Sequence, residues 1–116
     1  MLENFRIQIP SGWAVLRNLT WNFQSIEDLY TEDILSIESI IFEDERWVTD
    51  QNGYLLDLGW YDNNSTFTVR LIKGGWDNVI VEYSSPNFEI IQNQVLRILG
   101  YISSGISHEN IRLLIK

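Results

Sequence analysis

The chain has 116 residues, of which 45% are hydrophobic and 21% charged, with 16 acidic side chains against 8 basic ones. This length and composition predict a single globular domain, residues 1–116, and exclude a disordered chain. The absence of cysteine excludes disulfides, thiolate metal sites and thiol nucleophiles, and the net charge of −8 opposes direct binding to nucleic-acid phosphates.

The N-terminal stretch MLENFRIQIPSGW does not place a basic segment before an apolar run, so no secretory signal is expected. The sequence also lacks an apolar run of about 18 residues, the length that a membrane-spanning helix needs. We therefore expect a cytoplasmic protein without membrane association.

The N-terminal half predicts one strand and one short helix. Residues 13–23, WAVLRNLTWNF, have high β propensity and predict a strand. Residues 25–28, SIED, resemble a capping box with Asp in place of the usual Glu or Gln, which predicts a short helix through Asp33. The stretch ILSIESIIF (34–42) fits the spacing of a helix and that of a strand, and both interpretations stay open. Residues 49–53, TDQNG, predict a turn whose Asn-Gly pair is the strongest hairpin signal of the chain.

The middle of the chain predicts an antiparallel meander. Three segments show the period of two that strands with one packed face have, namely residues 53–62, 65–73 and 76–83. The connectors 62–64 and 74–75 hold Asp, Asn and Gly, which tolerate the positive φ of tight turns. Such short connections predict that consecutive strands pair with each other.

The period changes in the last third of the chain. Apolar side chains recur three or four residues apart and predict an amphipathic helix within residues 84–105. Ser85 is its expected N-cap, Pro86 suits the first helical position, and Gly105 ends it. Residues 107–116 predict a second short helix, capped by their first serine. The apolar stripe of the longer helix consists of Phe88, Ile91, Val95, Ile98, Leu99 and Ile102.

These elements together predict an α+β fold. The sheet is an antiparallel meander of about four to five strands, and a short helix lies in the N-terminal half. Because the apolar stripe of the C-terminal helix needs a surface to cover, we expect this helix to pack on one face of the meander.

No constellation of catalytic or metal-binding residues stands out. His108 is the only histidine, which excludes a histidine metal cluster and a dyad with cysteine. The acids of residues 43–45 have the chemistry to hold a hard cation, but the EF-hand spacing of acids and glycine is absent. Residues 73–75, KGG, lack the spacing of a phosphate-binding loop and predict a hairpin turn. We therefore expect no enzyme activity, no metal and no cofactor.

The negative charge is concentrated in one segment. Residues 26–50 hold nine acids and one base, Arg46, so this segment carries −8 while the other 91 residues are neutral. On a helix, like charges four apart such as Asp28 and Glu32 cost about 0.2–0.5 kcal/mol, and a surface tuned for stability mixes the two signs. One-signed charge interleaved with aromatic residues is typical of a protein interface, whereas a solvated face without a partner is the alternative.

We predict that this segment binds a basic macromolecule. Its acids would steer the partner, and its aromatic side chains would supply contact area. The predicted partner-binding residues are Glu27, Asp28, Tyr30, Glu32, Asp33, Glu43, Asp44, Glu45, Trp47 and Asp50.

The layout of the chain carries a family resemblance. IPSGWAVLRNLTWNF, an acidic middle, YLLDLGWYDNN, FTVRLIKGGWDN and a closing amphipathic helix follow one another over most of residues 9–102. This layout resembles the small immunity proteins of bacterial polymorphic-toxin and contact-dependent growth inhibition systems. The resemblance implies a cytoplasmic protein that binds and blocks one cognate toxin domain, often a basic nuclease, and has no activity of its own.

Two other functions fit the sequence. A small-molecule or metal-binding domain would use the aromatic residues Trp60, Tyr61 and Trp76 or the acid cluster, although Trp in a small sheet more often serves packing. A non-catalytic subunit or adaptor of a larger assembly is the third.

Overall fold

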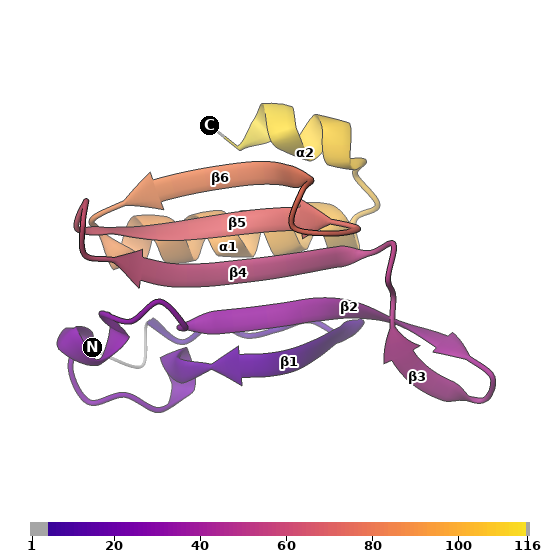
Figure 1. Ribbon diagram of the computed structural model, residues 1–116, viewed down its shortest axis with the longest axis horizontal. Coiled ribbons are helices and arrows are strands. Elements are labelled where there is room, and N and C mark those ends of the chain that lie inside the picture. The colour runs from indigo at the N-terminus through magenta and orange to yellow at the C-terminus, as the bar shows by residue number, and fades with distance from the viewer. Residues whose placement is uncertain (1–4, 116) are drawn as a thin grey trace.

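A sheet of six antiparallel strands carries the fold, with the longer helix on one of its faces (Figure 1). The computed structural model describes residues 5–115. Neighbouring strands follow the order β1-β2-β4-β5-β6, and β3 pairs with β2 outside this path. The architecture is α+β, as predicted. The strands are β1 (Trp13–Asn18), β2 (Leu35–Glu43), β3 (Arg46–Thr49), β4 (Tyr54–Tyr61), β5 (Thr66–Lys73) and β6 (Val79–Ser85).

The predicted meander is confirmed in β4, β5 and β6. β4 and β5 pair over their whole lengths, from Tyr54 opposite Lys73 to Tyr61 opposite Thr66. The third strand begins at Val79 instead of residue 76, because the residues before it close the turn. Within this turn, the amide of Asn78 donates to the carbonyl of Gly75 at 2.9 Å.

The N-terminal strand is shorter than predicted, since β1 ends at Asn18 and the 3₁₀ turn η2 (Leu19–Trp21) follows. The side chain of Asn18 accepts a hydrogen bond from the amide of Thr20 at 3.0 Å and donates to the carbonyl of Ile7 at 3.0 Å. Such local side-chain bonds compete with the strand ladder and end it.

The predicted helix of residues 25–33 is reduced to one 3₁₀ turn, η3 (Ile26–Leu29). Asp28 does cap it, because its carboxylate accepts the amide of Ser25 at 3.2 Å. The chain then leaves the helical path because it binds β4. Here the amide of Trp60 donates to the carbonyl of Thr31 at 2.8 Å.

Residues 34–42, which fitted both a helix and a strand, form most of β2. β1 and β4 flank the first half of β2, where Leu35 and Ile37 are fully buried. Pairing on both sides decides between the two local patterns, and together with β3 it brings the sheet to six strands.

The Asn-Gly pair forms a turn but not a hairpin, so the hairpin prediction at this point is wrong. The amide of Gly53 donates to the carbonyl of Asp50 at 2.9 Å, yet β3 and β4 do not pair with each other. Instead, β4 pairs with residues 35–38 of β2 and β3 with residues 40–43. The tight hairpin lies between β2 and β3.

The apolar stripe of α1 (Phe88–Ser103) packs on the sheet as predicted, and all its predicted positions except Ile102 are buried. The N-cap is Asn87 and not Ser85, because Ser85 ends β6 and Asn87 accepts the amide of Glu89 at 2.8 Å. Gly105 follows the helix end with a φ of 79°, as a C-terminal glycine does.

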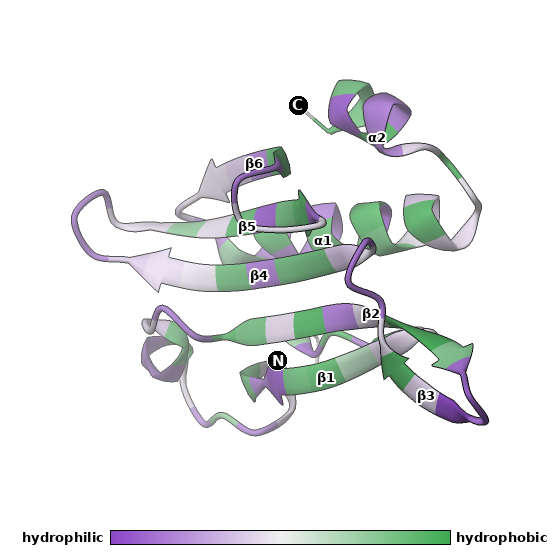
Figure 2. Ribbon diagram, turned by 45° about the vertical axis from the view of Figure 1, so that its right-hand side comes forward, coloured by the Kyte–Doolittle hydropathy of each residue, from purple (hydrophilic) through white to green (hydrophobic). Residues whose placement is uncertain are grey.

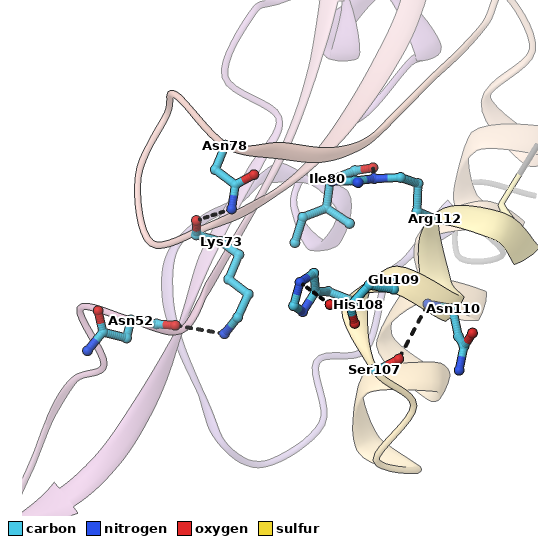
Figure 3. A network of polar contacts seen from close by, with 9 residues as sticks. All are labelled: Asn52, Lys73, Asn78, Ile80, Ser107, His108, Glu109, Asn110 and Arg112. Atoms are coloured by element: carbon cyan, nitrogen blue, oxygen red, sulfur yellow. Dashed lines mark hydrogen bonds and ion pairs between the residues drawn. The ribbon is translucent and has the colours of Figure 1, made fainter.

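The second helix, α2 (His108–Leu114), lies beside β6 at one edge of the sheet (Figure 1), and Figure 3 shows polar contacts of its residues. The side chain of Ser107 caps it by accepting the amide of Asn110 at 3.4 Å, as predicted, whereas the last residue of the predicted helix, Lys116, lies outside the described residues. The guanidinium of Arg112 donates to the carbonyl of Ile80 at 3.0 Å, so α2 is fixed to β6. His108 pairs with its neighbour Glu109 at 3.0 Å.

Candidate protein-binding hairpin

Nine of the ten predicted partner-binding residues fall into two groups at opposite ends of β2 (Figure 1), whereas Asp50 lies beside its middle, where its amide donates to the carbonyl of Ser39 at 3.0 Å. A nine-residue strand spans about 30 Å, so residues that are close in the sequence are far apart in space. The group before β2 is Glu27, Asp28, Tyr30, Glu32 and Asp33. The group after it is Glu43, Asp44, Glu45 and Trp47.

The second group lies on a β-hairpin that projects beyond the rest of the sheet. Its strands are the end of β2 and the whole of β3, and Asp44 and Glu45 form the two-residue turn between them. Both turn residues have positive φ, 53° and 65°, which is the backbone of a type I′ turn. Asn and Gly are the usual residues in this conformation, and a glutamate adopts it at a steric cost.

An aromatic pair lies exposed on this hairpin. Phe42 and Trp47 stand opposite each other across β2 and β3, and their ring centroids are 5.3 Å apart at an interplanar angle of 25°. Phe42 is 58% exposed and Trp47 is 65% exposed, and the neighbouring Ile41 is exposed as well. Trp47 is therefore not a core residue, and the Phe42–Trp47 pair forms an apolar surface in contact with solvent. Ile41 precedes Phe42 in the same strand and so lies on the opposite face of the hairpin.

Acidic side chains surround this aromatic pair. Glu43, Asp44 and Glu45 are exposed, and among the described residues none of them has a recorded ion pair or side-chain hydrogen bond. The only base on the hairpin is Arg46. Figure 2 shows the resulting pattern, a hydrophilic tip on strands that contain hydrophobic residues.

Four other acids of residues 26–50 have structural roles. Asp28 caps η3, and Asp33 forms an ion pair with Arg17 at 3.3 Å. Glu38 accepts a hydrogen bond from the hydroxyl of Thr49 at 2.7 Å. Asp50 similarly accepts the amide of Asn52 at 3.1 Å within the turn before β4. The concentration of charge in the sequence is thus only partly available to a partner.

The first group lies beside an aromatic stack that the sequence did not predict. Tyr30 packs on Trp60 with ring centroids 4.3 Å apart. The indole of Trp60 donates to the carboxylate of Asp62 at 2.6 Å. The only signal for this contact in the sequence was the presence of aromatic residues in both segments.

The three aromatic residues of the alternative ligand site do not form one pocket. Trp60 and Tyr61 line a hollow together with Tyr30, whereas Trp76 lines a separate hollow beside Gly74. Trp76 is also largely exposed in the turn before β6, so it does not serve core packing. Each hollow would have to bind a ligand with its own set of residues.

A charged row crosses the face of the sheet that lies opposite α1. Asp57 stands between Ser36 of β2 and Arg70 of β5, and Arg70 stands opposite Glu82 of β6. Burial raises the pKa of the Asp57 carboxyl, and the positive charge of Arg70 only partly offsets this effect. Polar residues at alternate positions were the signal for this row in the sequence. Its charges largely pair within the sheet.

No three side chains of the His, Cys, Asp or Glu type converge within residues 5–115 as a metal site requires. The same residues include no helix with the length and apolar character needed to cross a bilayer. In comparisons with known proteins, no family model, no curated sequence and no solved structure matches the chain.

Proposed function

We propose that this protein is a stoichiometric protein inhibitor, an immunity protein that binds and neutralises a basic, nuclease-type toxin domain in the cytoplasm. The β2–β3 hairpin is its principal binding element. One observation carries the proposal, namely the exposed Phe42–Trp47 pair surrounded by acids without internal partners. The same proposal excludes catalytic activity and a cofactor.

The hairpin combines the two components that protein interfaces use. Large aromatic side chains at the centre of a contact supply most of the binding free energy, and Trp is prominent among them. Acids at the rim, such as Glu43 and Glu45, accelerate association with a basic partner through steering. A nuclease that grips phosphates is basic, which makes it a suitable partner for this tip.

The steric cost at the turn supports a binding role. Glu45 has a φ of 65°, where glycine or asparagine would fit without strain. Strained conformations tend to cluster at functional positions. A glutamate here adds charge at the far end of the hairpin, where a partner meets it first.

The proposal is tested by searching the gene immediately upstream of this protein's gene for a toxin domain and measuring binding to that domain. Trp47→Ala should accelerate dissociation and cost about 2 kcal/mol or more of binding free energy, measured by surface plasmon resonance. Leu113→Ala is the matched control, because Leu113 on α2 is 63% exposed against 65% for Trp47. Equal affinity of the wild type and both variants, at equal melting temperature, would remove the hairpin from the interface.

An adaptor subunit is the second candidate that the same hairpin supports. The two functions differ in what the bound partner does, because an inhibitor abolishes the toxic activity and an adaptor leaves its partner active. Growth of cells that express the toxin domain, with and without this protein, separates them. Binding without protection from the toxin would favour the adaptor.

A further inference from the structure

The end of the sheet opposite the hairpin has a hollow of about 540 Å³ that combines aromatic and acidic side chains. It lies where the segment after η3 meets the end of β4 and the following turn. None of its lining residues is basic. They are Tyr30, Thr31, Glu32, Trp60, Tyr61, Asp62 and Asn63.

The aromatic part of the hollow is held in place from several sides. Trp60 packs on Tyr30 at 4.3 Å and meets the edge of Phe67 at 4.7 Å between ring centroids. Its indole N–H is bonded to Asp62 at 2.6 Å, which also orients this carboxylate. One face of Tyr30 rests on Trp60, and its ring also lies 6.0 Å from that of Phe67, while 45% of the residue is exposed.

The backbone on which these side chains stand is also fixed. The amide of Trp60 donates to the carbonyl of Thr31 at 2.8 Å, and the amide of Ile34 donates to the carbonyl of Leu58 at 3.0 Å. Between these two bonds, Gly59 lets the backbone of Glu32 approach β4 so closely that a Cβ at residue 59 would overlap it. The segment that carries Tyr30 and Glu32 therefore has a defined position before any partner binds.

The charge of the hollow is not neutralised from within the described residues. Glu32 and Asp62 line it, and neither has an ion pair in the described part of the chain. The guanidinium of Arg70 lies 5.1 Å from the ring of Tyr61 and pairs with Glu82 at 3.3 Å. A cation that enters from solvent thus meets two carboxylates and the exposed part of Tyr30.

We infer that this hollow receives the guanidinium group of an arginine side chain. A guanidinium is planar, stacks on an aromatic face and donates a fork of hydrogen bonds that matches a carboxylate. The exposed ring of Tyr30 supplies the face, and Asp62 and Glu32 supply the carboxylates. That the arginine belongs to the basic partner rests on the proposed function.

The chain itself places a guanidinium over an aromatic ring in three pairs, and in one of them, Arg70 with Tyr61, a carboxylate completes the site. The guanidinium of Arg70 lies over Tyr61, that of Arg6 over Trp21 at 4.8 Å, and that of Arg97 over Tyr101 at 5.7 Å. In two of these pairs the arginine also bonds the tyrosine hydroxyl, at 3.0 Å for Arg70 and 3.1 Å for Arg97. Tyr30 is a comparable ring without an arginine of its own among these contacts.

The test is a titration of the ¹⁵N-labelled full chain with the peptide acetyl-Gly-Arg-Gly-amide, followed by NMR. The indole N–H of Trp60 and the amides of Tyr30 and Glu32 should shift saturably. A citrulline peptide of the same shape should cause no comparable shift, because citrulline is neutral. A lysine peptide should bind at least about threefold more weakly, since an ammonium is not planar and cannot stack on a ring or bind a carboxylate through two parallel hydrogen bonds.

Variants separate the hollow from the general negative charge of the protein. Tyr30→Leu and Asp62→Asn should each lower the affinity for the arginine peptide by at least about threefold, as expected when one exposed cation–π or ionic contact is lost. The asparagine can still accept the indole N–H of Trp60. Asp77→Asn removes one charge at an exposed position in the turn between β5 and β6, at the far end of β5 from Tyr61, and should leave the affinity unchanged. Should Tyr30→Leu fail to fold, Glu32→Gln replaces it.

Equal shifts with arginine and citrulline, unchanged affinity in both hollow variants, or shifts centred on the hairpin would each overturn the inference. The peptide titration involves no toxin, so its result is independent of the proposed function. With the toxin domain present, a loss of affinity in Trp47→Ala but full affinity in Tyr30→Leu would show that the partner places no arginine here. Failure of the wild-type protein to bind the toxin would refute the proposed function and leave the hollow's preference for arginine as measured.

Discussion

Phe42 and Trp47 stack across the two strands of a hairpin, 5.3 Å apart, and both are more than half exposed. In most small domains such a pair is in the core. Here it lies beside a turn made of Asp44 and Glu45, two residues with positive φ. A sequence that places apolar area and backbone strain together in solvent indicates a surface that is completed by another molecule.

Relieving the strain at the turn should stabilise the hairpin. Asp44→Asn with Glu45→Gly introduces the residues that type I′ turns favour, and we expect the local opening free energy to rise by about 0.5–1 kcal/mol. Hydrogen exchange of the Ile41 and Val48 amides measures this opening. Ser65→Gly is the control, because Ser65 also has positive φ, 52°, but lies in the turn between β4 and β5. Unchanged exchange in the double variant would show that the turn is not strained.

Reversing charge at the tip should slow association with a basic partner. We expect Glu43→Lys with Glu45→Lys to lower the association rate at low salt by roughly tenfold, and the difference should shrink as salt screens the charges. Asp77→Lys with Glu89→Lys makes the same change in net charge at two exposed positions outside residues 26–50. Stopped-flow measurements over a salt series compare the two. Equal slowing in both variants would assign the effect to net charge and not to the tip.

Gly59 should be intolerant of any side chain. A Cβ at this position would overlap the backbone of Glu32, so Gly59→Ala should destabilise the fold by about 1–3 kcal/mol. Gly100→Ala is the control, since Gly100 lies in α1 with open space around it and should gain about 0.5–1 kcal/mol. Urea denaturation measures both. A neutral Gly59→Ala would mean that residues 30–33 move away from β4 at no cost.

The carboxyl of Asp57 should make stability depend on pH. Burial raises its pKa in the folded state, so the folded protein holds this proton more tightly than the unfolded chain does. Its contribution to stability is therefore largest below the ordinary aspartate range, near about 4, and is lost as pH rises through the raised pKa. Asp57→Asn should remove this loss of stability with rising pH and should raise the unfolding free energy at pH 7 relative to wild type. Denaturation curves from pH 3 to 7 test it, and parallel curves for both proteins would contradict it.

Local patterns in the sequence predicted the meander, the long helix and its packing, because these depend on short-range periodicity and turn chemistry. Residues 34–42 were undecided since β2 is defined by partners on both sides, which no local pattern reports. The hairpin at Asp44-Glu45 was missed because its residues are not the ones such turns favour.

The candidate site was predicted in composition but not in arrangement. The acids and aromatics of residues 26–50 were treated as one surface, whereas an extended strand separates its two ends by about 3.3 Å per residue. The Tyr30–Trp60 stack joins residues that are 30 positions apart in the sequence, and only the folded sheet brings them together. Backbone pairing therefore determined which of the predicted residues share a surface.

The β2–β3 hairpin contributes no side chain to the core. Among the described residues, the core and the apolar side chains packed against it include none between Ile40 and Gly53. Under the proposed function, recognition by the hairpin and folding are therefore encoded in different parts of the chain. Such a hairpin could accumulate substitutions and change its preferred partner while the domain keeps its stability, so a lineage of such proteins could track a changing target without passing through unfolded intermediates.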